Sequence, residues 1–288
     1  MTDYDIRAME ALLSRHGFRF SKSMGQNFLI DPDVPRAIAE ASGADEGNGV
    51  LEIGPGIGTL THELCRRAGK VVSVELDRAL LPILDETMAN FDNFEVVSAD
   101  ILKTDIPALV REKLAPLQPI VCANLPYNIT TPALTALLRA GCFSSLTVLV
   151  QKEVAERLCA RPGTHSYGAF SVFMQYYTEP ELLFTVPAEA FLPAPKVTSA
   201  VLRAAVRIEP PVEVADEAFF FRTVNAAFAL RRKTLVNSLM TAFGELGKEE
   251  LARTVESCGL PPDVRGERLG LAEFARLAAA LSEKLKND

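Results

Sequence analysis

The sequence contains no tryptophan, only three histidines, and no apolar run near the roughly 18 residues that a membrane span needs. Its five cysteines are odd in number and scattered, with no C-x-x-C pair, so neither a disulfide framework nor a structural zinc site is expected. Residues 1–13 carry acids among their apolar residues and so lack the basic start of a signal peptide. We therefore expect a cytoplasmic protein with reduced thiols, no metal and no membrane partner.

An excess of basic residues is also missing. Lys and Arg total 30 against 37 Asp and Glu, which gives a formal net charge of -7. Domains that bind nucleic acid through bulk electrostatics are usually strongly basic. Any nucleic-acid partner must therefore be held by local cationic patches.

The sequence does contain the ordinary composition of a globular protein, with 48% hydrophobic and 23% charged residues. Its 288 residues suffice for about two domains. Short β-branched or apolar runs alternate with helix-length segments in the first half, at residues 50–53, 71–74, 94–98, 119–123 and 146–151. This alternation predicts a Rossmann-like α/β fold, a mostly parallel sheet with helices on both faces.

The pattern changes near residue 208. Strand-like alternation over residues 199–208 is broken by the Glu-Pro-Pro sequence that follows, and the rest of the chain shows helical spacing with almost no strand signal. We therefore predict an α/β domain over residues 1–208 and a small all-helical domain over residues 209–288.

The segment LEIGPGIG at residues 51–58 lies between a predicted strand and a predicted helix. Its glycines would let a ligand approach the backbone, so Gly54 and Gly56 are candidate cofactor contacts. It is not a P-loop, because no Gly-Lys-Ser/Thr follows, and its third glycine comes one residue early for the dinucleotide-binding G-x-G-x-x-G. The acid Glu52 favours a ligand with a cationic part, which S-adenosylmethionine fits better than a dinucleotide.

Two carboxylates end the next two predicted strands. Glu75 lies where a doubly wound sheet places the acid that accepts hydrogen bonds from ribose hydroxyls. Asp100 could accept a hydrogen bond from the exocyclic amine of adenine. Strand-end acids also commonly cap the next helix, so each acid alone has two interpretations. Their order after the glycine loop favours cofactor binding.

The tetrapeptide Asn124-Leu125-Pro126-Tyr127 follows a strand and should lie at the carboxyl edge of the sheet, beside the cofactor. A target for such a loop is an adenine N6 or a similar amine, which is a poor nucleophile because its lone pair is delocalised into the ring. The Asn124 side chain and the Leu125 carbonyl could accept hydrogen bonds from its two N–H groups and direct the lone pair at a methyl carbon. Pro126 would fix the loop, and Tyr127 could stack on the base. Asn-x-Pro-Tyr is also an ordinary turn, but this position in the sheet favours catalysis.

Several motifs occur in the order found in one enzyme family. They are QNFL (26–29), LEIGPGIG (51–58), ELD (75–77), ADI (99–101), NLPYNI (124–129), QKEV (151–154), YG (167–168) and FLPAPKV (191–197). Together they resemble the ribosomal RNA adenine dimethyltransferases over nearly the whole chain. FALRRKTLVNSL at 228–239 and the segment 265–269 resemble the housekeeping group that acts on the small subunit. Met24 is a local departure, where Phe or Leu is more common.

The resemblance implies a cofactor site for S-adenosylmethionine formed by Asn27, Leu29, Gly54, Glu75, Asp100 and Asn124. It implies that a flipped adenine is held between Tyr127 and Phe191. Successive transfers would give N6,N6-dimethyladenine at two adjacent adenines in the hairpin near the 3′ end of small-subunit (16S) rRNA. The expected partner is an assembling small ribosomal subunit, and the expected state is a monomer.

Arg231, Arg232 and Lys233 are candidate RNA contacts, although a charge run on a helix is often only a solvated face. Three other functions stay open. A resistance-type enzyme that dimethylates large-subunit (23S) rRNA shares the fold and a similar loop. A ribosome-assembly factor could use the same fold mainly for binding. A small-molecule methyltransferase would need an enclosing lid domain, which the helical tail does not suggest.

Overall fold

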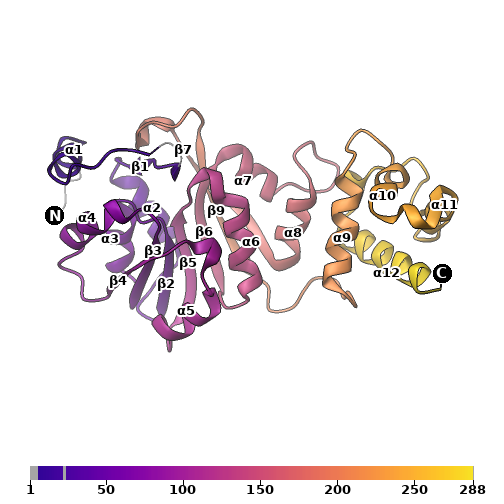
Figure 1. Ribbon diagram of the computed structural model, residues 1–288, viewed down its shortest axis with the longest axis horizontal. Helices are drawn as coiled ribbons and strands as arrows, with labels where there is room; N and C mark the ends of the chain where they lie inside the picture. The colour runs from indigo at the N-terminus through magenta and orange to yellow at the C-terminus, as the bar shows by residue number, and fades with distance from the viewer. Residues whose placement is uncertain (1–5, 22–23, 288) are drawn as a thin grey trace. The chain divides into compact units, whose positions relative to one another are not determined.

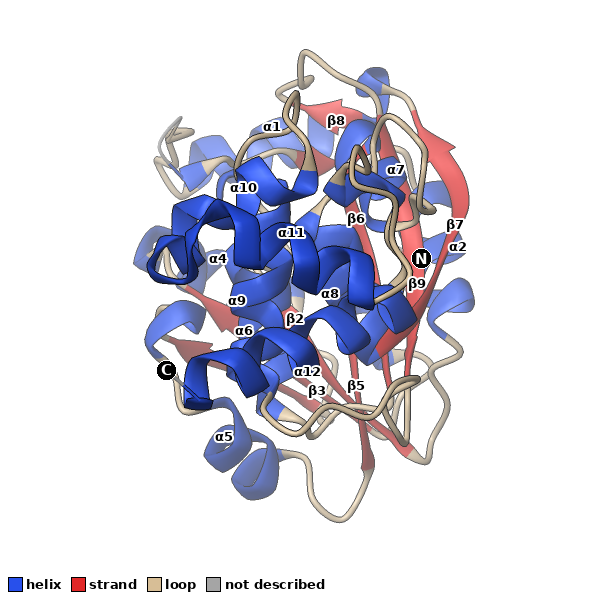
Figure 2. Cartoon of the chain, turned by 90° about the vertical axis from the view of Figure 1, so that its right-hand side faces the viewer, coloured by secondary structure: helices blue, strands red, loops and turns tan. Residues whose placement is uncertain are grey.

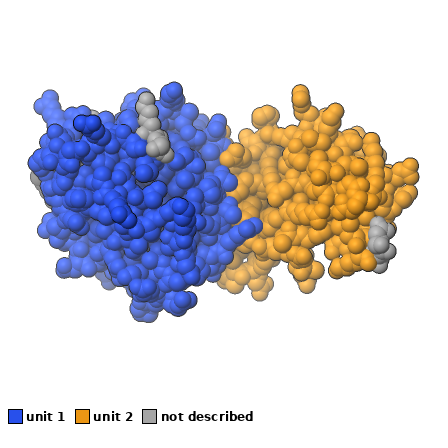
Figure 3. All heavy atoms as spheres, in the orientation of Figure 1, with its two compact units in different colours: residues 1–155, 181–206 blue, residues 156–180, 207–288 orange. Residues whose placement is uncertain are grey.

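The computed structural model describes residues 6–21 and 24–287, which form two compact units. The first unit contains the chain up to residue 155 together with residues 181–206, and the second contains residues 156–180 and 207–288 (Figure 3). The chain crosses between the units three times, and the last crossing falls at residues 206–207, close to the predicted boundary. The first crossing differs from the prediction, because residues 156–180 group with the helical unit.

A seven-stranded sheet organises the first unit, in the order β4-β3-β2-β5-β6-β9-β7 (Figure 1). Its strands are β2 (Asn48–Ile53), β3 (Lys70–Glu75), β4 (Phe94–Ser98), β5 (Gln118–Asn124), β6 (Ser145–Gln151), β7 (Thr178–Val186) and β9 (Ser199–Val206). The first five are parallel, and β9 runs antiparallel to β6. Strand order reverses between β2 and β5, and this is where open α/β sheets bind ligands. The predicted mostly parallel sheet is confirmed.

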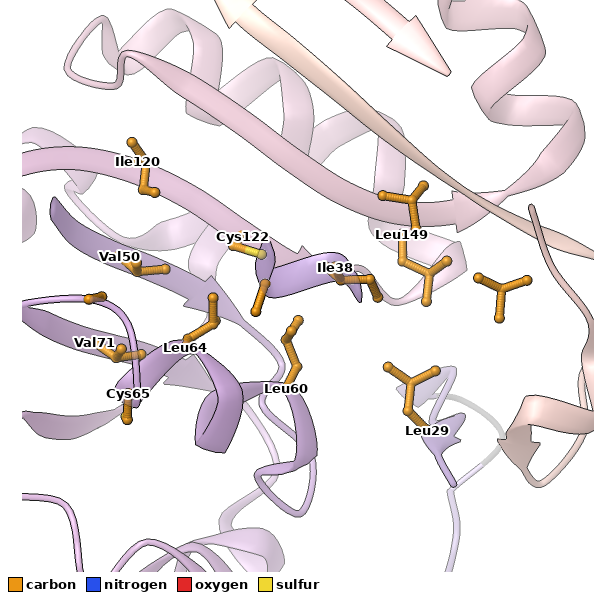
Figure 4. Close-up of a cluster of buried hydrophobic side chains, with 14 of the residues drawn as sticks. Leu29, Ile38, Val50, Leu60, Leu64, Cys65, Val71, Ile120, Cys122 and Leu149 are labelled. Atoms are coloured by element: carbon orange, nitrogen blue, oxygen red, sulfur yellow. The ribbon is translucent and has the colours of Figure 1, made fainter. Parts of the chain in front are cut away.

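The helices of the first unit are α1 (Ile6–Arg15), α2 (Asp33–Ser42), α3 (Thr59–Cys65), α4 (Leu81–Thr87), α5 (Ile106–Lys113), α6 (Thr130–Ala140) and the start of α7 (Lys152–Leu158). A core cluster packs α2 and α3 against the sheet (Figure 4). Leu60 and Leu64 lie one turn apart on α3 and pack with Ile38 of α2 over Val50 and Val71, all 2% exposed or less. This packing fixes the start of α3, and with it the glycine loop.

A second, two-stranded sheet joins distant parts of the chain. β1 (Phe28–Leu29) pairs antiparallel with β8 (Phe191–Leu192), so that Leu29 lies opposite Phe191. Neither strand was predicted, because two residues are too few to show an alternating pattern. The pairing holds the segment before α2 against the core of the first unit, because Leu29 and Phe191 both belong to the core cluster.

The second unit is helical, as Figure 2 shows. It contains the rest of α7, α8 (Ala169–Tyr177), α9 (Glu217–Phe228), α10 (Leu235–Phe243), α11 (Gly247–Ser257) and α12 (Leu271–Asn287). Residues 156–180 belong to it because Phe173 and Tyr176 of α8 are buried against Phe221 and Phe220 of α9, with ring centroids 5.3 Å apart in both pairs. Such aromatic packing is a strong apolar contact. No helix within residues 6–21 and 24–287 is long and apolar enough to cross a membrane.

Short 3-10 helices complete the chain: η2 (Arg78–Leu80), η3 (Ile101–Lys103), η4 (Tyr127–Ile129), η5 (Ala188–Ala190), η6 (Gly244–Leu246) and η7 (Gly266–Arg268). Three of them follow parallel strands of the sheet within a few residues: η2 follows β3, η3 follows β4 and η4 follows β5. η2, η3 and η4 therefore place residues at the carboxyl edge of β3, β4 and β5.

Candidate active site

A pocket lies at the carboxyl edge of the parallel strands, beside the reversal of strand order. The loop after β2, the ends of β3, β4 and β5, and residues 24–29 line it. Its lining includes every predicted cofactor residue and four of the five predicted catalytic residues: Asn27, Leu29, Gly54, Gly56, Glu75, Asp100, Asn124, Leu125, Pro126 and Tyr127. Segments 100 positions apart in sequence, Asn27 and Tyr127, therefore meet in one cavity.

The glycine loop needs its glycines for two different reasons. Gly54 and Gly56 have backbone φ values of +67° and +61°, which residues other than glycine rarely adopt. A Cβ on Gly56 would lie 2.9 Å from the ring of Phe28, so this glycine also lets β1 pack on the loop. A Cβ on Gly54 would face Pro126 at 3.6 Å, across the pocket wall. The contact between Gly56 and Phe28 has no signal in the sequence.

Glu52 is the acid at the base of this loop, and it is only 1% exposed. Its Oε2 accepts hydrogen bonds of 2.7 Å from the hydroxyls of Thr61 and Ser73. Its Oε1 is buried without a hydrogen-bond partner among the described residues. Burial raises the pKa of Glu52 to about 7. A buried, unpaired carboxylate oxygen in a pocket wall fits a ligand that brings a hydrogen-bond donor or a positive charge.

Glu75 is the last residue of β3, as predicted, and Asp100 lies two residues after the end of β4. Glu75 is 6% exposed, and its Oε1 accepts a 2.7 Å hydrogen bond from the amide of Asp77. Burial raises its pKa to about 7. Asp100 accepts a 3.0 Å hydrogen bond from the amide of Leu102 and so caps η3. The capping interpretation is therefore correct for Asp100, which lines the pocket as well.

The Asn124 side chain has a defined orientation. Its Nδ2 donates a 3.1 Å hydrogen bond to the carbonyl of Asn27. Because a carbonyl needs a donor, this bond assigns the amide nitrogen and leaves Oδ1 as the acceptor for another group. The next residue, Leu125, is held by a 3.1 Å bond from its amide to the carbonyl of Leu149 on β6. The pocket therefore contains an oriented acceptor on a fixed loop.

Part of the pocket wall is apolar and was not predicted. Leu76 and Leu102 line the pocket although they are 53% and 41% exposed. Each follows a strand-end acid by one or two positions, and this spacing is the signal that could have revealed them. Apolar side chains beside hydrogen-bonding acids fit a flat ring that carries polar groups at its edge.

The structure does not bring Phe191 into the pocket. Its side chain is 2% exposed and packs in the cluster with Leu29, Ile38 and Val201. In β8 the side chains alternate, which directs Phe191 inward and leaves Leu192 partly exposed. In this conformation the Phe191 ring has no exposed face on which a base could stack. This corrects the prediction that the adenine is held between Tyr127 and Phe191.

The predicted cationic triplet belongs to the second unit. Arg231, Arg232 and Lys233 are exposed, and none forms an ion pair within the described part of the chain. A helix was predicted here, but the three residues lie in the turn between α9 and α10. Arg231 donates a hydrogen bond to the carbonyl of His165. Among the described residues, no group of three or more His, Cys, Asp or Glu side chains could hold a metal ion.

A Rossmann-like sheet with a glycine loop, two strand-end acids and an oriented asparagine at the reversal of strand order is the architecture of an S-adenosylmethionine-dependent methyltransferase. Residues 17–263 match the ribosomal RNA adenine dimethylase family. The chain belongs to this family, which confirms the resemblance inferred from the motifs.

Individual relatives cover nearly the whole chain. The ribosomal RNA small subunit methyltransferase A of Geobacillus thermodenitrificans is 48% identical over 274 residues, 94% of each chain. The protein of the same name from Streptococcus pneumoniae is 48% identical over 285 residues, 98% of each chain.

Two solved structures extend the comparison. The 23S rRNA methyltransferase ErmE has a TM-score of 0.68 and 28% identity, and the match covers 89% of this chain and 100% of that one. A dimethyladenosine transferase from Plasmodium falciparum has a TM-score of 0.77 at 22% identity, covering 89% and 98%, and this likeness supports the fold alone.

Proposed function

We propose that the protein transfers methyl groups from S-adenosylmethionine to N6 of two adjacent adenines in the 3′-terminal hairpin of 16S rRNA, giving N6,N6-dimethyladenine. The observation that carries the proposal is the Asn124 side chain, which lines an acid-lined pocket at the carboxyl edge of the sheet and whose bond from Nδ2 to the carbonyl of Asn27 leaves its oxygen as the acceptor. Two proteins named as small-subunit methyltransferases, 48% identical over nearly the whole chain, support the choice of the small subunit.

The pocket residues fit this cofactor. S-adenosylmethionine supplies an electrophilic methyl group on a sulfonium cation. Glu75 would accept hydrogen bonds from the ribose hydroxyls, and Asp100 from the adenine amine. The unpartnered Oε1 of Glu52 would complement the positive charge of the methionine portion. Leu76 and Leu102 would contact the faces of the adenine ring.

The target base would be aligned by the Asn124-Tyr127 loop. Asn124 Oδ1 and the Leu125 carbonyl would accept hydrogen bonds from the amine, which localises the nitrogen lone pair and directs it at the methyl carbon. Tyr127 would stack on the base after it leaves the RNA helix, and this repays part of the few kcal/mol that unstacking costs. After the first transfer one N–H remains, so one acceptor suffices for the second.

RNA contact would come from loops of the second unit. The turn at 230–233, the loop at 161–165 and the turn at 264–268 are adjacent. Backbone bonds of 2.7 Å join Gly163 to Glu267 and Leu235 to Val264. The exposed cations on these loops are Arg161, Arg231, Arg232, Lys233, Arg265 and Arg268. We call these six residues the cationic loop cluster. Such a local cluster would bind phosphates although the whole chain carries a charge of -7.

The partner would be an assembling small subunit in the cytoplasm, and the protein would act as a monomer without a metal. The protein would also be able to bind the subunit without transferring a methyl group, because the cationic loop cluster and the pocket belong to different units. A role in assembly beside catalysis is therefore compatible with this site.

Tritiated methyl transfer to undermethylated small and large subunits, assayed side by side, tests the proposal. We expect label in the small subunit only, and dimethyladenosine after nuclease digestion of its RNA. Label in the large subunit would identify a resistance-type enzyme instead. Binding to small subunits without any transfer would identify an assembly factor.

A further inference from the structure

Ser199 is not among the predicted site residues, yet its hydroxyl contacts the loop that would hold the base. The Tyr127 hydroxyl and the Ser199 Oγ are 2.5 Å apart, which is a short O–H···O hydrogen bond. Ser199 is fully buried, whereas Tyr127 is half-buried in the pocket wall. The pair therefore ties a side chain of the pocket to the interior of the sheet.

The topology of the sheet explains how Ser199 reaches this loop. Ser199 is the first residue of β9 and lies opposite Gln151, the last residue of β6. Because β9 runs antiparallel, its first residue lies at the edge where the parallel strands β5 and β6 end. The loop at residues 124–127, which we call the NLPY loop, begins at this same edge. β9 therefore provides a rigid anchor beside Tyr127, the first residue of the short helix η4.

The hydroxyl of Tyr127 needs a role other than stacking. A phenylalanine ring would stack on a base about as well, since stacking depends on the aromatic face. A tyrosine ring on a loop can change its side-chain torsions, and a hydrogen bond to a strand-held serine removes that freedom. A serine hydroxyl can donate or accept, so the bond forms with either atom as the donor.

We propose that Ser199 is a positioning residue that holds the Tyr127 ring in the orientation on which the target adenine stacks, so that N6 faces Asn124. The proposal rests on the proposed methyl transfer. It concerns alignment after binding, because RNA affinity depends mainly on phosphate contacts and cofactor affinity on the acids of the pocket. Ser199 should therefore affect the rate of transfer and not the affinity for either ligand.

Single-turnover methyl transfer to undermethylated small subunits tests this with four variants. Ser199→Ala and Tyr127→Phe break the same hydrogen bond from opposite sides, and the double variant combines them. Ser145→Ala is the matched control, since Ser145 is a buried serine on β6 opposite Ala205, at the far end of the same strand pair. Cofactor affinity is measured by calorimetry, and thermal unfolding reports on the fold.

We expect Ser199→Ala and Tyr127→Phe each to slow transfer about tenfold, the effect of losing one ordinary hydrogen bond. The double variant should be no slower than the singles, because the two changes remove one interaction. The half-saturating subunit concentration and the cofactor affinity should stay within twofold of wild type, and Ser145→Ala should transfer at the wild-type rate.

Independent effects, with the double variant about 100-fold slower, would overturn the proposal, as would an unchanged rate in Ser199→Ala. An equal loss in Ser145→Ala would show a general effect on the sheet. Failure of the wild-type protein to methylate either subunit would instead contradict the proposed function, so the two failures are distinguishable.

Discussion

Asn124 donates a hydrogen bond of 3.1 Å from its side chain to the backbone carbonyl of Asn27, 97 positions earlier in the chain. The bond joins the NLPY loop to the segment that precedes β1. It also makes the two ends of the Asn124 amide unequal, since the nitrogen is occupied and the oxygen is available. Different replacements of Asn124 should therefore slow methyl transfer for different reasons, depending on whether the nitrogen, the oxygen or both are lost.

Asn124→Ala should slow methyl transfer at least about 100-fold, because one preorganised polar group is removed from the reacting amine. Asn124→Asp should be at least as slow, since a carboxylate oxygen would face the carbonyl of Asn27 and lose the bond that orients the side chain. Single-turnover assays measure the rate, and calorimetry the cofactor affinity, which should fall less than the rate. Near-normal transfer by the alanine variant would show that Asn124 only shapes a turn.

Cofactor affinity should rise with pH between about 6 and 8. Burial raises the pKa of both Glu52 and Glu75 to about 7, so each is partly protonated in the free protein. A ligand that carries positive charge and donates hydrogen bonds favours the ionised form, which lowers both pKa values and releases protons. The dependence should be less than tenfold per pH unit for each acid, and affinity should weaken as pH falls below 7.

Calorimetry in two buffers of different ionisation enthalpy at pH 7 measures this proton release directly. Glu75→Gln removes one of the two acids with little change in size, so it should weaken binding at pH 8 by about 1 to 3 kcal/mol and flatten the pH dependence. A binding reaction that takes up no protons and releases none would contradict the assignment of both acids to the site.

Phe191→Ala should cost about 3 to 5 kcal/mol of unfolding free energy, because a ring that is 2% exposed leaves a cavity between β8 and the core. Phe191→Leu should cost less, since most of the volume is kept. Urea denaturation measures the destabilisation, with Phe20→Ala as a control whose side chain is 40% exposed. Loss of methyl transfer at unchanged stability in Phe191→Ala would instead favour the predicted contact with the base.

Neutralising Arg231, Arg232 and Lys233 should weaken binding to small subunits. It should also lower the slope of log K against log salt by about 2, because each phosphate contact that is lost lowers the slope by about 0.7 to 0.9. Filter binding across a salt series measures the slope. The matched control neutralises three cations of the same unit that already pair with acids: Arg253, Arg276 and Lys284. The control changes net charge equally, so an equal effect on the slope would mean that the triplet does not bind phosphate specifically.

Features set by neighbouring residues along the chain could be predicted. The five parallel strands, the glycine loop and the acid Glu75 each follow from short patterns, and all lie where a doubly wound sheet requires. Features set by pairing between distant segments could not. Phe191 looked like a base contact because its neighbours form a motif, but its pairing with Leu29 turns the ring into the core. The triplet likewise lies in a turn that bonds to distant segments, since Arg231 donates to the carbonyl of His165 and the amide of Leu235 to that of Val264.

The pairing of β1 with β8 and the position of Ser199 also bear on biosynthesis. A nascent chain that has left the ribosome only through residue 155 already carries the glycine loop and every acid of the pocket. It still lacks the strand that holds residues 28–29 and the serine that holds Tyr127. Since β9 must also join β6, the contacts that hold residues 28–29 and Tyr127 in the pocket wall form only after residues 191–206 have been translated. A cofactor that binds only the fold with these contacts in place can therefore stabilise it only late in synthesis.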